Sequence, residues 1–148
     1  SFTSVRLANV FGPGMKTEGD GRVMSDFIAD AIAGRDIVLK SDGTAVRAFC
    51  YISDAISGMM HVALKGSPGE AYNLSHECEP SPIGDVAQMV CNASRHDIKV
   101  VKHATASNTG YCNYQRTALN NAKIQQLGFT PRVPLTEGIA RTLHFFEQ

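Results

Sequence analysis

The chain has 148 residues, of which 43% are hydrophobic and 19% charged, and its 14 basic side chains balance its 14 acidic ones. This length and composition indicate one folded domain with a proper core and exclude an intrinsically disordered chain. With no net charge and no two adjacent Lys or Arg residues, we expect no general affinity for nucleic acid or an anionic membrane. The longest apolar stretch, 48–52, is far below the roughly 20 residues that span a bilayer, so we expect a soluble, cytoplasmic protein.

Turn residues and hydrophobic spacing predict strands that alternate with helices in the first half of the chain. The segments expected as strands are 4–10, 37–39 and 71–74, and those expected as helices are 22–33 and about 54–65. Asp20 or Ser25 can cap the first helix and Ser53 or Asp54 the second, where we expect Asp54 to be a cap rather than a catalytic acid. Apolar side chains of the second helix recur at helical spacing, which predicts that they face the core: Ile56, Met59, Met60 and Ala63.

The second half of the chain continues this alternation. A third helix is expected to begin at Pro82, with Ser81 as its cap, and to end near Ser94. A strand over 98–101, a polar loop over 104–114, a short helix over 119–127 and a terminal helix capped by Thr136 follow. Strands that alternate with about five helices predict an α/β fold.

The four cysteines, at positions 50, 78, 91 and 112, are too far apart for a zinc knuckle or a redox motif. We therefore expect free thiols in a reducing compartment. The five histidines form no His-x-x-x-His pair. We expect no metal site.

Several strings follow one another in a characteristic order over nearly the whole chain. They are RLANVFGPG at 6–14, DGRV at 20–23, RAFCYISD at 47–54, GEAYNL at 69–74, NAKI at 121–124 after Arg116, LGFTP at 127–131 and LTEGI at 135–139. Together they resemble the carboxyl-terminal half of extended short-chain dehydrogenases/reductases that act on nucleotide sugars, the NAD-dependent epimerase/dehydratase family. The resemblance is greatest to its UDP-glucuronate decarboxylase branch.

The resemblance implies a division of labour between two halves of one enzyme. Residues 15–148 would form the nucleotide-sugar substrate-binding domain, and residues 1–14 the last strand and loop of an NAD-binding Rossmann half that is otherwise absent. That half normally carries a Gly-x-x-Gly-x-x-Gly turn and a Tyr-x-x-x-Lys pair, and neither occurs in this sequence. We therefore expect NAD and a homodimer in the intact enzyme, and neither NAD binding nor turnover by this chain alone.

Three residues are implied as ligands of the diphosphate of a nucleotide sugar, foremost a UDP-sugar. Asn9 and Arg47 would contact it, and Arg116 would reinforce it from a late loop, since arginine forks and amides bind phosphate well. The alternatives are a loop cap for Asn9 and a solvated surface position for each arginine.

Three further residues are implied at the nucleotide. Asn73 would support its pocket, with a turn hydrogen bond as the alternative. Leu39 and Lys40 match the family segment whose backbone runs beside the base.

Arg22 is the one residue to which the resemblance gives a catalytic role. An arginine at this place in the decarboxylase branch lies near the sugar carboxylate, where it could help to position a proton donor. The alternative is an arginine in a polar first turn. That branch usually has Arg directly after the earlier Gly-Pro, whereas this sequence has Gly14, so epimerase and dehydratase activities remain open.

Two functional hypotheses remain. The first is the substrate half of an NAD-dependent epimerase, dehydratase or decarboxylase that works through a transient keto-sugar. The second is a stand-alone nucleotide-binding or interaction module without catalysis. Under the first, strand 4–10 would have lost its neighbours, so we expect the chain to self-associate through it; the alternative is that it folds back on its own domain or is disordered.

Overall fold

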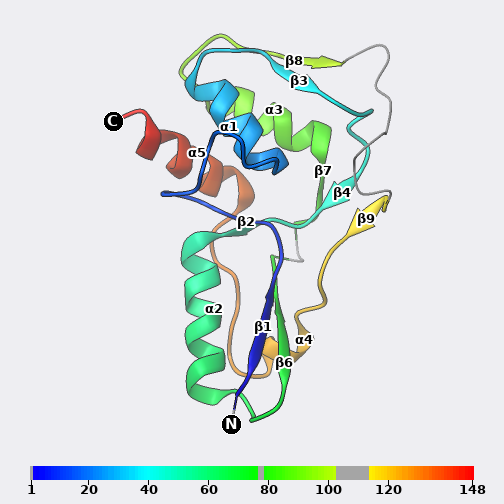
Figure 1. The fold of residues 1–148 in the computed structure, drawn as a ribbon, viewed down its shortest axis with the longest axis vertical. Coiled ribbons are helices and arrows are strands. Elements are labelled where there is room, and N and C mark those ends of the chain that lie inside the picture. The colour runs from blue at the N-terminus through cyan, green and yellow to red at the C-terminus, as the bar shows by residue number, and fades with distance from the viewer. Residues whose placement is uncertain (1, 77–78, 103–113) are drawn as a thin grey trace.

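The computed structural model describes residues 2–76, 79–102 and 114–148, which form an α/β fold with five helices and short strands (Figure 1). The strands are β1 (Ser4–Leu7), β2 (Val10–Phe11), β3 (Ile37–Leu39), β4 (Val46–Arg47), β5 (Cys50–Tyr51), β6 (Ala71–Leu74), β7 (Ser81–Pro82), β8 (Val100–Lys102) and β9 (Arg116–Thr117). The helices are α1 (Val23–Ile32), α2 (Ile52–Lys65), α3 (Ile83–Ala93), α4 (Ala122–Gln125) and α5 (Leu135–Phe146).

One end of the molecule is built on a parallel pair of strands. Strand β1 pairs with β6, with Ser4 opposite Ala71 and Leu7 opposite Leu74. Helices α2 and α4 lie against this pair at the end where the N-terminus lies (Figure 1). The apolar side chains between them form a core of their own: Cys50, Ala55, Val62, Tyr72, Leu74, Ile124 and Phe129.

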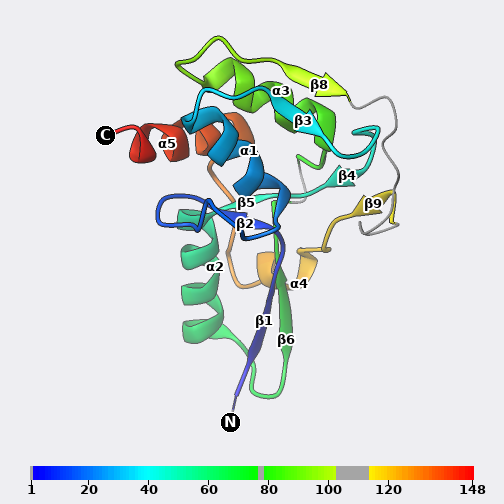
Figure 2. The same cartoon turned by 45° about the horizontal axis from the view of Figure 1, so that its top comes forward.

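The other end is a group of three helices. Helices α1, α3 and α5 pack against one another, and the parallel pair β3–β8 lies across them (Figure 2). A larger hydrophobic core fills this end and includes Phe27, Ile28, Val90, Ile139 and Leu143. The helices predicted at 22–33, from Pro82 and at the C-terminus are therefore confirmed, because their apolar stripes face one another.

Two small sheets join the two ends. Strand β2 pairs in parallel with β5, and β4 pairs on one side with β7, antiparallel, and on the other with β9, parallel. Parallel pairing of strands so far apart in the chain brings residues near 10, 47 and 116 to one region of the molecule. This region holds the candidate site.

Several boundaries differ from the sequence predictions. The strand expected at 4–10 is interrupted at Asn9, whose φ of 38° turns the backbone between β1 and β2. Helix α2 begins at Ile52, two residues before the predicted start. The helix expected at 119–127 is shortened to α4, and the strand expected at 98–101 overlaps β8 in sequence. The loop expected at 104–114 lies outside the described residues except for Tyr114.

The predicted side-chain caps are wrong. The N-cap positions of α1, α2, α3 and α5 are Arg22, Tyr51, Pro82 and Pro134, none with a side-chain capping hydrogen bond. The polar side chains expected as caps have other partners or positions. The Ser25 hydroxyl donates to Asp20, Asp54 accepts from backbone amides near residue 132, the Ser81 hydroxyl donates to the Glu79 carbonyl, and Ser53 and Thr136 lie inside their helices.

The predicted core face of α2 is also wrong. Ile56, Met59 and Met60 are 51%, 37% and 54% exposed, while Ala55 and Val62 are buried. The helix turns Gly58 towards β6, where an added Cβ would collide with the Leu74 side chain. A close approach through glycine therefore decides which face is buried, and the large apolar side chains lie outside it.

Candidate functional site

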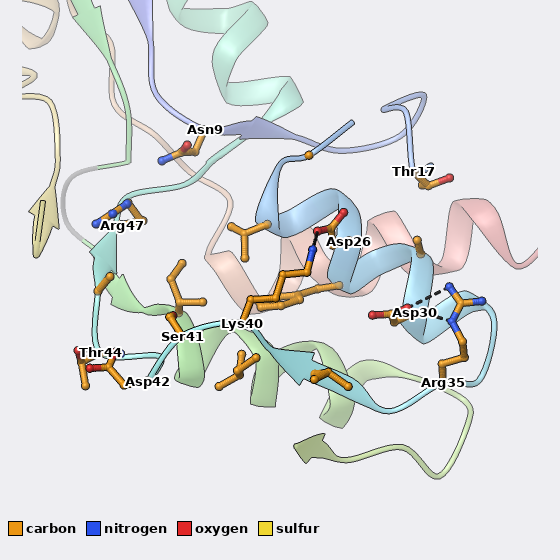
Figure 3. A pocket seen from close by; sticks show the side chains of 18 of the residues that line it. Asn9, Thr17, Asp26, Asp30, Arg35, Lys40, Ser41, Asp42, Thr44 and Arg47 are labelled. Atoms are coloured by element: carbon orange, nitrogen blue, oxygen red, sulfur yellow. Dashed lines mark hydrogen bonds and ion pairs between the residues drawn. The ribbon is translucent and has the colours of Figure 1, made fainter. Parts of the chain in front are cut away.

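The candidate site is a cavity of about 900 Å³ between α1, β3 and β4 (Figure 3). Other parts of its lining come from Asn9, the loop at residues 17–21, Ile83, Tyr114 and Gln115. It brings together four of the seven residues that the sequence resemblance singled out: Asn9, Leu39, Lys40 and Arg47.

Asn9 lies at the corner between β1 and β2. A positive φ is uncommon for a residue other than glycine, although asparagine tolerates it better than most. Its side-chain Nδ2 donates to the Ala48 carbonyl at 2.8 Å, which ties this corner to the segment before β5. The hydrogen bond fits the loop-cap alternative, but the same side chain also lines the cavity.

Arg47 ends β4 and is half-buried. Its Nη1 donates to the Val46 carbonyl at 2.8 Å, and β4 is held on both sides by β7 and β9. Figure 3 shows its guanidinium on the same side of the cavity as Asn9. The sheet therefore fixes the backbone that presents this positive charge.

Leu39 and Lys40 lie at the end of β3. Leu39 is buried against the core, and Lys40 reaches across the cavity so that its Nζ lies 3.0 Å from Oδ2 of Asp26 on α1 (Figure 3). A second ion pair, 2.9 Å long, joins Asp30 of α1 to Arg35 at the other end of the cavity from Arg47. In Figure 3 the Lys40–Asp26 pair thus lies between Arg47 on one side and the Asp30–Arg35 pair on the other.

Three predicted residues do not line the cavity. Arg22 is paired with Asp20 and donates from Nη1 to the Val10 carbonyl at 3.4 Å. Asn73, inside β6, donates from Nδ2 to the Asn120 carbonyl at 3.1 Å, which links distant parts of the chain and is not the turn hydrogen bond of the alternative. Arg116 is exposed on β9, although the two residues before it line the cavity.

The Asp20 carboxylate explains part of the position of Arg22. The hydroxyl of Ser25 and then the guanidinium of Arg22 donate to it and lower the pKa of Asp20 below its ordinary value. Asp20 therefore stays ionised near neutral pH. Arg22 accordingly has a carboxylate partner within its own loop.

Sequence reasoning missed the residues of the β3–β4 turn and of the loop before α1. Asp42 accepts hydrogen bonds from the backbone amide and hydroxyl of Thr44, at 3.0 and 2.8 Å, and these bonds lower its pKa. The Asp42-Gly43 dipeptide signalled a turn, but not that the turn borders a cavity. On α1, the spacing of Val23, Asp26 and Asp30 could have shown one polar-edged helix face.

Two other kinds of site find no support among the residues that the structure describes. No group of three or more His, Cys, Asp or Glu side chains is placed to hold a metal ion in that part of the chain. Cys50 and Cys91 are buried free thiols, and burial raises the pKa of Cys50 to about 12. The Cys50 thiol is therefore protonated and unsuited to act as a nucleophile near neutral pH.

Of the described helices, none is both long and apolar enough to cross a membrane.

The fold matches part of the fold of sugar-nucleotide epimerase structures. A UDP-glucose 4-epimerase from Thermotoga maritima, solved with UDP-glucose, superposes with a TM-score of 0.85 over 97% of this chain and 45% of its own, at 23% identity. A UDP-glucuronic acid 4-epimerase from Bacillus cereus, solved with a fluorinated UDP-glucuronic acid and NAD, gives a TM-score of 0.79 over 97% and 44%, at 21% identity. At these identities the likeness shows the fold alone.

The sequence comparisons show the family. The model of the NAD dependent epimerase/dehydratase family matches residues 1–75, about half of the chain, so the chain belongs to that family. UDP-glucuronic acid decarboxylase 6 from Arabidopsis thaliana is 31% identical over 134 residues, covering 90% of this chain and 37% of that protein. Human dTDP-D-glucose 4,6-dehydratase is 27% identical over 145 residues, covering 97% and 41%. The chain thus spans less than half the length of these relatives.

Proposed function

We propose that the chain is the carboxyl-terminal, substrate-binding half of an NAD-dependent nucleotide-sugar epimerase, dehydratase or decarboxylase, with a UDP-sugar as its foremost ligand. The observation that carries the proposal is the cavity, because it gathers Asn9, Leu39, Lys40 and Arg47 from separate parts of the chain. The relatives support it, since they include a UDP-glucuronic acid decarboxylase, a dTDP-D-glucose 4,6-dehydratase and a UDP-glucose 4-epimerase.

The chemistry of the cavity fits a diphosphate better than a neutral ligand. Arg47 offers a planar fork of donors on a strand fixed from both sides, and Asn9 adds an amide beside it. Arg116 faces solvent on β9, opposite Val46 of β4. The two carboxylates of α1 that line the cavity, Asp26 and Asp30, are each paired with a cation, which lessens their repulsion of an anionic ligand.

The described residues do not fit the dinucleotide itself. The glycines at 12, 14, 19 and 21 belong to a long loop between β2 and α1, pinned by Asp20 and Ser25, rather than to a tight strand-to-helix turn. We therefore assign NAD to another part of the intact protein, where it would take hydride from the sugar and return it. The resulting keto-sugar acidifies its neighbouring positions, so one scaffold can support epimerisation, elimination or decarboxylation.

The β1–β6 pair supports the proposal that a further strand, from another part of the intact protein, lies beside β1. In line with the alternative that this segment folds back on its own domain, β1 has one partner, β6, within this chain. A parallel sheet of two strands is nevertheless a fragment of a larger sheet in most folds, and the described part of the chain gives β1 no second partner. Leu7, the last residue of β1, is 47% exposed, and α2 exposes Ile56, Met60 and Leu64. We assign this surface to the NAD-binding half, which would also carry the homodimer contacts.

Self-association of the chain alone would follow from that exposed surface. Sedimentation should show oligomers at high concentration, and replacing Ile56 and Met60 by Gln should favour the monomer. A strict monomer throughout would contradict the assignment of this surface.

The decarboxylase branch rests on Arg22, which would have to leave Asp20 to reach a sugar carboxylate. In the intact protein, Arg22→Ala should abolish release of carbon dioxide from UDP-glucuronate and spare nucleotide binding. A wild-type protein that releases none would leave epimerase or dehydratase chemistry. The second hypothesis, a stand-alone nucleotide-binding or interaction module, is favoured instead if the gene encodes no cofactor half upstream.

The test of the proposed function is UDP binding, measured by calorimetry on this chain. Arg47→Ala should weaken binding by about 1.5–3 kcal/mol, the scale of a charge-assisted hydrogen bond, or roughly 10- to 150-fold in Kd. Arg35→Ala is the matched control, because Arg35 lines the other end of the cavity and is paired with Asp30. Equal effects of the two changes, or no UDP binding by the wild-type chain, would refute the proposal.

A further inference from the structure

The ion pair between Lys40 and Asp26 connects two walls of the cavity. Lys40 follows β3 and Asp26 lies on α1, and both side chains line the cavity. Their side chains are 62% and 35% exposed. An ion pair this exposed contributes little to stability, because water solvates both charges and both side chains must be held in one geometry. Its place inside the cavity therefore calls for another explanation.

Lys40 and Arg47 stand at the two ends of one turn. The connection between β3 and β4 begins at Lys40, and Arg47 ends β4 (Figure 3). Asp42, the acid of this turn, accepts two hydrogen bonds from Thr44 and so helps to fix the turn itself. A fixed turn that carries a cation at each end, both lining one cavity, suits a ligand with two adjacent phosphates.

We propose that Lys40 is a second phosphate-binding cation and that Asp26 holds and restrains it. This inference rests on the proposed function. Before a ligand binds, the Asp26 carboxylate keeps the Lys40 ammonium over the cavity. When a nucleoside diphosphate enters, Nζ of Lys40 donates a hydrogen bond to a non-bridging phosphate oxygen, with no covalent change and the proton still on nitrogen. Asp26 competes with the phosphate for the Lys40 ammonium, and its negative charge repels the phosphate.

The two members of the pair therefore have opposite effects. Removing the charge of Lys40 should weaken binding of a nucleoside diphosphate. Removing the charge of Asp26 should strengthen it, because a competing anion is lost from the cavity. Neither change should alter binding of a nucleoside that carries no phosphate.

The chain offers a closely matched control. Asp30 is one helical turn beyond Asp26, lines the same cavity and is paired with Arg35 at 2.9 Å, with exposures of 27% and 62%. Asp30→Asn thus makes the same change of charge on the same helix face, but away from Lys40. A general electrostatic effect would appear in both variants, whereas the effect proposed here belongs to Asp26.

The experiment measures UDP and uridine binding to the chain by nuclear magnetic resonance titration. Lys40→Met should lower UDP affinity about tenfold and Asp26→Asn should raise it roughly threefold, on the scale of one charge-assisted hydrogen bond. Uridine affinity should stay unchanged, Asp30→Asn should resemble the wild type, and Lys40→Arg should retain most of the UDP affinity. Thermal unfolding verifies that each variant is folded.

Several results would overturn this role. Equal losses for UDP and uridine in Lys40→Met would place Lys40 at the base instead. Weaker UDP binding by Asp26→Asn would rule out competition between Asp26 and the phosphate for Lys40. An equal gain in UDP affinity in Asp26→Asn and Asp30→Asn would rule it out as well. If the wild-type chain binds UDP and all variants bind it equally, this inference alone fails; if the wild-type chain does not bind UDP, the proposed function fails with it.

Discussion

Asp54 offers the sharpest test of how the two ends of the molecule are joined. It lies in the first turn of α2, is only 5% exposed, and its Oδ2 accepts hydrogen bonds from the backbone amides of Arg132 and Val133, each at 2.9 Å. These amides belong to the segment that leads into α5. One carboxylate oxygen thus connects the start of α2 to a distant part of the chain.

Replacing Asp54 by Ala removes both hydrogen bonds and leaves two amides without this acceptor. A hydrogen bond to a charged group contributes about 1.5–3 kcal/mol, and buried donors without partners add a cost, so the free energy of unfolding should fall by about 3–5 kcal/mol. Asp54→Asn keeps an acceptor oxygen but loses the charge, and should cost about 1–2 kcal/mol.

Urea denaturation, followed by circular dichroism, measures these differences. Asp42→Ala is the control, because Asp42 also accepts a backbone amide but does so at the surface, and its loss should be much smaller. A free energy of unfolding for Asp54→Ala within 1 kcal/mol of the wild type would refute this reasoning. Equal losses for Ala and Asn would show that the charge contributes most of the effect.

Two further predictions concern acid stability and packing. The Thr44 hydrogen bonds hold the pKa of Asp42 below its ordinary value of 3.8, so the stability that Asp42 adds is complete above pH 3.8 and is lost as the pH falls through the lowered pKa. The urea midpoints of the wild type and of Asp42→Asn should therefore converge in acid. A difference between the two midpoints that stays constant with pH would contradict the assignment. Gly58→Ala should lower the free energy of unfolding by about 1–3 kcal/mol, because the added Cβ would collide with the Leu74 side chain. Gly84→Ala is the control and should be neutral or stabilising, because the nearest atom that its added Cβ would meet is 3.5 Å away. A higher melting temperature for Gly58→Ala than for Gly84→Ala, measured by calorimetry, would contradict the packing described for α2.

Sequence patterns predicted the positions of the helices better than they predicted which residues the helices contact. The apolar spacing of α1, α3 and α5 was sufficient because each of these helices buries one stripe against the others. The cap expected at Asp54 was mispredicted because its hydrogen bonds are made to residues far along the chain, which no local rule contains. The core face of α2 was mispredicted because Gly58, which carries no hydrophobic signal, makes the closest approach.

The candidate site shows the same limit. Asn9, Leu39, Lys40 and Arg47 were singled out because they stand within strings that resemble a family, and the cavity does bring them together. Asp26 was missed because an acidic residue in the first turn of a helix needs no explanation beyond the helix dipole. Its pairing with Lys40 depends on how α1 and β3 are placed in space, which the sequence of either segment does not encode by itself.

Strand β4 has a consequence for when the site comes into being during folding. It is two residues long, and its neighbours β7 and β9 come from much later in the chain. Closing such long loops is entropically costly and is rewarded only when the distant strands arrive, so local structure forms first. Arg47 thus takes its position only after β7 and β9 have joined β4, so a partly folded molecule that already contains α1 or α3 lacks this wall of the cavity. Under the proposed function, nucleotide binding would report completed folding, and a bound nucleotide would slow the opening of β4 before that of any helix.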